Sequence, residues 1–234
     1  MSWLALLLIG IGVSDLGRST TARPLPAGGI GAGVGVLVGL LAGLTGAGDL
    51  TAMVVGVFVV LAWSVLSPAR PRAALGVLAG GVVTALLLTA WASNAGGAVG
   101  DWLDATRLPL LQDTDADRAL LVLGVLLVQL TTGNTIVRLV LTMTGSTPPT
   151  TGRSLKGGRL LGPMERLVIL GLGLAGQATA AGLVIAAKGL IRWPELQSFK
   201  GEEGPSIDEV TEYFLVGSFV SWLVALGSLA LLAT

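Results

Sequence analysis

Apolar residues occur along this chain in long blocks, and most polar residues lie between the blocks. A helix needs roughly 20 apolar residues, with a range of about 17–25, to cross a bilayer. Eight blocks predict helices, near residues 2–14, 28–46, 50–67, 73–92, 119–144, 160–176, 178–193 and 210–232. The first and seventh are short, so either could be a half-helix or an interfacial segment. The pattern predicts an all-α, polytopic integral membrane protein with about seven or eight transmembrane helices.

The blocks predict one transmembrane domain over residues 1–234. Four spans fall within residues 1–92, an acidic outer loop covers 93–118, and the remaining spans fill 119–234, with a helical hairpin at 160–193. The fifth block is interrupted by the polar run Thr131–Asn134, which predicts a tilt, a kink or an extension beyond the bilayer. Alternating aspartates in the outer loop lack the glycine turn and distal glutamate of a calcium loop, so we interpret them as solvated charge.

Composition supports the membrane class and excludes several chemistries. Only 12% of the residues are charged, against about 25% in soluble domains. Net charge is zero and no basic block is present, so no nucleic-acid partner is expected. The chain contains neither cysteine nor histidine, the ligands of most zinc and haem sites, and Ser-His-Asp catalysis is excluded. We predict no cofactor and no metal, although a carboxylate-only magnesium or calcium site is left open.

The basic residues predict an orientation. Positive side chains are retained on the cytoplasmic side of spanning helices. In an alternating eight-span arrangement one side collects Arg18, Arg23, Arg70, Arg72, Arg153, Lys156, Arg159, Lys188, Arg192 and Lys200. The other side keeps Arg107 and Arg118 among five aspartates. Both termini are therefore predicted outside; a re-entrant short segment would reverse the parity after it.

Small residues recur every four positions in three of the blocks. They are Gly31, Gly35, Gly39 and Gly43, then Gly76 and Gly80, then Gly217, Ser221 and Ala225. Such spacing lets helix backbones approach closely in lipid. Tight packing within the chain is the favoured interpretation, and contact between two copies in a homo-oligomer is the alternative.

The hairpin at 160–193 carries charges at matching depths. Its turn is predicted near Gly176-Gln177, with Glu165 twelve residues before Gln177 and Lys188 eleven after it. Because helices rise about 1.5 Å per residue, the two charges are predicted at nearly the same height on antiparallel arms. Ionisable groups within apolar spans are costly, usually paired and often functional.

These charges belong to a larger set of candidates at the predicted inner face. The ligand- or headgroup-binding candidates are Arg138, Glu165, Arg166, Lys188, Arg192, Glu212 and Tyr213. We expect Glu165 to face Lys188, and Arg166 to face a phosphate headgroup or Glu212. Interfacial anchoring and stabilising pairs are the favoured interpretation, and an anion-binding pocket or a gated polar path at the inner face is the functional alternative. Gln129, Asn134 and Gln177 are polar intramembrane candidates, for which interhelical hydrogen bonds of about 1 kcal/mol each are favoured. No catalytic residue is assigned.

The C-terminal third of the chain resembles a known bacterial family. The matching features are Gly158-Arg159, Gly162, Glu165-Arg166, Gly176-Gln177, Ala186-Ala187-Lys188, Arg192, and Glu212-Tyr213 with Gly217. Over residues 158–227 they resemble the membrane family catalogued as domain of unknown function 3307; the first half of the chain matches poorly. Histidines expected early in that family are absent, and Asp15 is the acidic residue retained there. The resemblance implies a multi-pass protein of the bacterial cytoplasmic membrane and supplies no activity.

Three classes of function are compatible with these features. The favoured class is a non-enzymatic protein that binds membrane lipids or serves as a subunit of a larger membrane complex, with a membrane-protein partner or a second copy. A small-solute or ion transporter or channel is the alternative, based on the interruptions at Thr131–Asn134 and Gly176-Gln177. A lipid-modifying enzyme, using Glu165, Glu212 or Asp15 as acid or base, comes third.

Overall fold

The computed structural model describes residues 1–21, 23–106, 114–145, 158–198 and 207–233, with the side chains of 158–159, 191–198 and 207–210 left out. The described chain is all-helical, as predicted, and contains no strand. Within these described ranges, five helical stretches are long and apolar enough to cross a membrane: Ser2–Thr21, Pro24–Leu41, Ala47–Leu66, Ala116–Thr144 and Thr211–Ala233. Pro71–Leu87 and Ala178–Leu190 are shorter apolar helices. The chain therefore has the character of a multi-pass membrane protein.

The chain divides into two compact units, residues 1–132 and 133–234. Unit 1 contains α1 (Ser2–Thr21), α2 (Pro24–Leu41), α3 (Ala47–Leu66), α4 (Pro71–Leu87), the 3-10 turn η1 (Thr89–Trp91), α5 (Gly97–Ala105), α6 (Ala116–Leu127) and the π-helical segment η2 (Val128–Thr132). Unit 2 contains α7 (Gly133–Thr144), α8 (Gly158–Leu174), α9 (Ala178–Ser198) and α10 (Ile207–Ala233). The boundary falls within the predicted fifth span.

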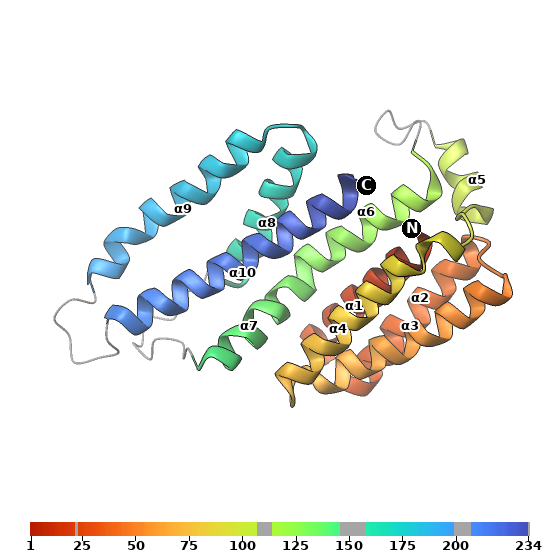
Figure 1. The fold of residues 1–234 in the computed structure, drawn as a ribbon, viewed down its shortest axis with the longest axis horizontal. Coiled ribbons are helices and arrows are strands. Elements are labelled where there is room, and N and C mark those ends of the chain that lie inside the picture. Colours follow the sequence, from red (N-terminus) through yellow and green to blue (C-terminus); the bar gives the residue numbers. More distant parts are fainter. Residues whose placement is uncertain (22, 107–113, 146–157, 199–206, 234) are drawn as a thin grey trace. The chain divides into compact units, whose positions relative to one another are not determined.

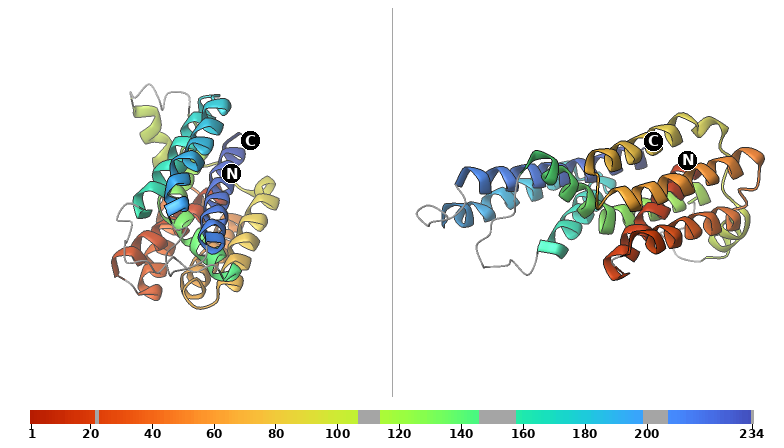
Figure 2. Two further views of the ribbon diagram at one scale, coloured as in Figure 1. Left: turned by 90° about the vertical axis from the view of Figure 1, so that its left-hand side faces the viewer. Right: turned by 90° about the horizontal axis from the view of Figure 1, so that it is seen from below.

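In unit 1, α1 is the central helix and packs against α2, α3, α4, α6 and η2. Helices α1 to α4 stay alongside one another in every view (Figures 1 and 2). The apolar residues Leu4, Ile9 and Ile11 of α1 are buried among these neighbours. The prediction of a short first span ending before Asp15 is wrong, because the helix continues to Thr21. It can continue because Asp15 and Arg18 pair with each other inside the bundle.

Close approach of α1 and α2 depends on glycine. A Cβ built on Gly31 would lie 2.3 Å from the carbonyl oxygen of Gly10, and one on Gly39 would lie 2.8 Å from Leu6 Cδ1. Gly43 lies beyond the end of α2, in the turn to α3, with φ +73°. In α4, by contrast, a Cβ on Gly76 or Gly80 would meet no described atom within 4 Å. The four-residue spacing of glycines therefore marks a helix contact in α2, whereas in α4 Gly76 and Gly80 face open space.

In unit 2, α8 and α9 form the predicted hairpin. Its turn passes through Gly176, whose φ of +73° lies in the left-handed region that favours glycine. Helix α10 packs against α7, α8 and α9. Ile169, Ala181 and Ala225 form a small buried core, with Leu172, Val184, Ile185 and Trp222 around it.

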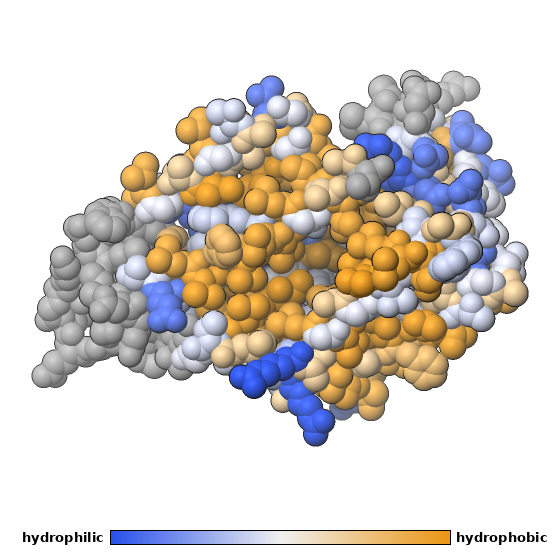
Figure 3. All heavy atoms as spheres, viewed as in Figure 1, coloured by the Kyte–Doolittle hydropathy of each residue, from blue (hydrophilic) through white to orange (hydrophobic). Residues whose placement is uncertain are grey.

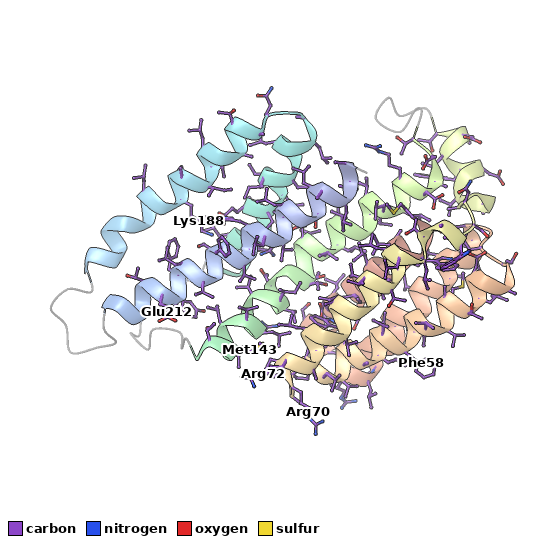
Figure 4. The ribbon with its side chains drawn as sticks, in the orientation of Figure 1. Phe58, Arg70, Arg72, Met143, Lys188 and Glu212 are labelled. Carbon is purple, nitrogen blue, oxygen red and sulfur yellow. The ribbon has the colours of Figure 1, made fainter. Side chains whose placement is uncertain are left out.

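Large apolar side chains cover much of the helix surface. Phe58, Leu87 and Leu190 are 67%, 74% and 75% exposed, which is typical of surfaces that face lipid rather than water. Apolar colour dominates the visible helix faces in Figure 3. Phe58 projects from α3, and Arg70 and Arg72 mark the start of α4 (Figure 4).

Candidate functional site

The hairpin charges form an ion pair within unit 2. Lys188 Nζ of α9 (labelled in Figure 4) donates to Glu165 Oε2 of α8. Trp222 of α10 donates its indole N–H to Glu165 Oε1 at 2.9 Å. The predicted pairing at matched height is confirmed. The carboxylate thus joins three helices, and its side chain is 7% exposed against 19% for Lys188.

The guanidinium of Arg166 is bound by residues of α7 and α10. It donates from Nη2 to Asn134 Oδ1 at 2.9 Å and from Nη1 to Ser221 Oγ at 3.1 Å. A Cβ on Gly133 would lie 2.7 Å from Arg166 Cζ, so the guanidinium occupies space that only a glycine leaves open. The residue is 1% exposed. Adjacent residues on a helix point in different directions, so Arg166 faces α7 and α10 while Glu165 faces α9. Arg166 therefore bonds to Asn134 and Ser221 and not to the expected partners, Glu212 or a headgroup.

Two adjacent residues of α8 are matched by two adjacent residues of α10. Glu165 accepts from Trp222, while Arg166 donates to Ser221. Asn134 makes the interhelical hydrogen bond that the sequence favoured. The role of Ser221 as an acceptor was missed, since its position in a small-residue pattern indicated packing alone.

The other predicted residues whose side chains the structure describes do not join this cluster. Arg138 and Glu212 are exposed on α7 and α10, and Tyr213 is half-buried. Gln177 is exposed at the hairpin turn. The side chain of Arg192 lies outside the described residues. Lys188 Nζ, in addition to its ion pair, lies 6.0 Å from the ring centre of Phe214.

Unit 1 holds a second buried polar cluster, which the sequence did not predict. Arg18 donates to the Asp15 carboxylate and to Ser67 Oγ. Trp63 donates its indole N–H to both Asp15 oxygens, at 3.2 Å each. Asp15 and Trp63 are buried, although they are 48 residues apart in the chain. The spacing of three between Asp15 and Arg18 was the available signal, because it places both on one helix face.

A π-helical segment, Val128–Thr132, overlaps the predicted polar interruption Thr131–Asn134 at Thr131 and Thr132. Thr131 Oγ1 donates to the carbonyl oxygen of Gly12 at 3.0 Å, which joins this segment to α1. Gln129 and Thr132 are fully buried within unit 1. Single π turns inside α-helices are frequent at functional sites. The segment positions polar side chains in the interior of the bundle.

The Met1 end of unit 1 is polar and acidic. Trp3 donates its indole N–H to Asp49 Oδ1 at 2.7 Å, and the Ser93 backbone N–H reaches the same oxygen at 3.3 Å. The terminal amine lies 3.9 Å from Asp117 Oδ1. The opposite end carries Arg18 together with the exposed side chains of Arg23, Arg70 and Arg72. Arg118 is exposed next to Asp117, and Asp15 lies beside Arg18. Carboxylates therefore outnumber cations at the Met1 end, and cations outnumber carboxylates at the opposite end.

Both clusters have the chemistry of fixed hydrogen bonds and ion pairs between helices. Within the described part of the chain, no three His, Cys, Asp or Glu residues are grouped as a metal site would require. Comparison with protein-family models, with curated proteins and with solved structures found no match.

Proposed function

We propose that the chain is a non-enzymatic, lipid-contacting subunit of a larger assembly in a bacterial cytoplasmic membrane, with seven or eight spans and a C-terminal third related to domain of unknown function 3307. The observation that carries the proposal is that two charged side chains of α8 are buried and bonded within unit 2, whereas the exposed helix faces are apolar. Glu165 and Arg166 are directed inward and bonded to neighbouring helices, while large apolar side chains are exposed on the helix faces. Such faces contact lipid tails or the helices of a partner.

The proposal includes headgroup binding, but only by those predicted residues that are accessible at the surface. The exposed side chains of Arg138 and Glu212 and the half-buried Tyr213 are accessible at the helix surface. Arg166 is buried and acts by holding α7, α8 and α10 together. We therefore assign lipid or partner contact to the first group and cohesion of unit 2 to Arg166, Glu165 and Lys188.

We expect a discrete complex when the tagged chain is extracted from its own membrane with a mild detergent. Native electrophoresis and native mass spectrometry should show a protein or lipid mass that is retained at stoichiometric amount. Leu160→Ser and Leu183→Ser test apolar contact, since both side chains are strongly exposed. Loss of the retained mass in either variant supports the proposal. A bare monomer under every extraction condition contradicts it.

Transport is the second candidate, because the π-helical segment places Gln129 and Thr132 inside an apolar bundle. Interruptions of this type line the sites of many transporters. A bare monomer in the extraction experiment would favour this function, and solute flux in proteoliposomes should then depend on Gln129.

The charge separation in unit 1 supports the proposed orientation, with Met1 outside. Because the chain has no cysteine, single cysteines can be labelled without background. We expect a membrane-impermeant maleimide to label Thr45→Cys and Ala105→Cys in intact cells, and Ser19→Cys and Ala69→Cys only after permeabilisation. All four positions are exposed in the structure. The reverse pattern would place Met1 in the cytoplasm and overturn the proposed orientation.

A further inference from the structure

An apolar hollow lies among α1, α2 and α3 in unit 1. It is a small groove that is open on one side, and every side chain that lines it is apolar. Four glycines, Gly10, Gly31, Gly35 and Gly56, contribute to the lining, together with Trp3 at one end and Val60 at the other. Gly56 also lines the hollow, and a Cβ there would meet no described atom within 4 Å, so a larger side chain has open space at this position.

The hollow is shorter than the hydrocarbon part of one leaflet. Along α1 it extends from Trp3 to Gly10, which corresponds to about 10 Å at 1.5 Å per residue. Half of a hydrocarbon core of about 30 Å measures about 15 Å. The hollow therefore begins near the Met1 end of the bundle and ends before the middle of the bilayer. Lipid tails are the apolar groups available at that depth, and filling the space gains dispersion contacts.

The polar groups around the Met1 end indicate which lipid fits. Trp3, which lines the hollow, is held by Asp49. Helix α5 adds the exposed carboxylates Asp101 and Asp104, and it starts beside the turn between α2 and α3, where Gly96 N–H bonds to Ala42 O at 2.8 Å. The exposed Arg118 and the terminal amine also lie at this end, but the carboxylates outnumber them. This acidic surrounding attracts an ammonium group and repels a headgroup with net negative charge.

We propose that the hollow holds one acyl chain of a phospholipid whose headgroup carries an amine, such as phosphatidylethanolamine. The amine lies toward the carboxylates of the Met1 end, and the acyl chain follows α1 past Gly35 and Gly56 toward Val60. The inference does not depend on the chain being a subunit. It requires that unit 1 lies in a bilayer, which the cysteine labelling tests separately.

The test is lipid retention by the purified full-length chain. Native mass spectrometry is carried out with phosphatidylethanolamine or phosphatidylglycerol of identical acyl composition. We expect one retained phosphatidylethanolamine, and a loss of retention of about tenfold or more in Gly56→Leu, whose side chain fills the hollow. Gly76→Leu is the matched control, since Gly76 also has open space but does not line the hollow. Its retention should equal that of the parent chain.

Equal retention in the two glycine variants would overturn the proposal, and so would equal retention of the two lipids. Retention of a second protein chain that Gly56→Leu abolishes would identify the hollow as a helix-docking surface instead. If Gly56→Leu fails to fold, the unmodified chain is titrated with phosphatidylethanolamine brominated on its acyl chain. We then expect quenching of tryptophan fluorescence with a component that Trp3→Phe removes. Absence of that component contradicts the proposal.

Discussion

Gly31→Ala is expected to destabilise unit 1 by about 3 kcal/mol, near the upper end of the range for overpacking. The added Cβ would lie 2.3 Å from the Gly10 carbonyl oxygen and 2.8 Å from the Ser14 backbone nitrogen. Both atoms belong to the backbone of α1, so a rotamer change cannot relieve the contact. The two helices must separate, and their packing is lost along much of their length. Unfolding of the purified chain in mixed detergent micelles measures the change.

Gly33→Ala is the matched control for this prediction. Gly33 lies on the same helix, and a Cβ there would meet no described atom within 4 Å. The substitution should be neutral or stabilising by up to about 1 kcal/mol, because alanine favours the helix over glycine. Equal stability of the Gly31 and Gly33 variants would show that α1 and α2 do not pack through Gly31.

Removal of Lys188 alone is expected to cost about 3 kcal/mol, whereas removal of both charges of its pair costs much less. Lys188→Met leaves the buried Glu165 carboxylate without its cation, which is the costly way to break such a pair. In the double variant Glu165→Gln with Lys188→Met, the amide oxygen still accepts from Trp222. The double variant should therefore recover most of the loss, and a double-mutant cycle measures the coupling.

Arg138→Met provides the control for the loss of a cation, because Arg138 is exposed on α7. It should change stability by less than about 0.5 kcal/mol. Additive losses from the two single substitutions would contradict a coupled pair. A double variant that is stable but loses the retained mass of the native complex would show that the pair contacts a partner rather than holding the hairpin together.

The buried pairs also explain how an apolar chain specifies one arrangement of helices. Glu165 joins α8, α9 and α10, and Arg166 joins α8, α7 and α10. In unit 1, Asp15 and Arg18 join α1 to α3 through Trp63 and Ser67. A different lateral order of helices would leave these groups in hydrocarbon, where unsatisfied polar groups cost several kcal/mol each.

Much of the fold could be read from the chain. The apolar blocks predicted the helices, because a helix is the structure that satisfies a lone apolar segment in lipid. Gly176 and the nearly equal separations of Glu165 and Lys188 from the turn predicted the hairpin and its ion pair, since both depend on local geometry along one pair of consecutive helices. The end of the first span was misjudged, because Asp15 and Arg18 resemble a helix terminus until their partners on α3 are known.

The sequence by itself determined the membrane class, most of the helices and the matched charges of the hairpin. Only the tertiary structure decided that Gly31 meets a backbone while Gly76 meets open space, that Arg166 rests on Gly133, and that Trp63 reaches Asp15. The reason is physical. In a bilayer the surroundings are as apolar as the protein interior, so hydrophobic periodicity does not indicate which helix face is buried, and the partners of polar groups come from distant segments.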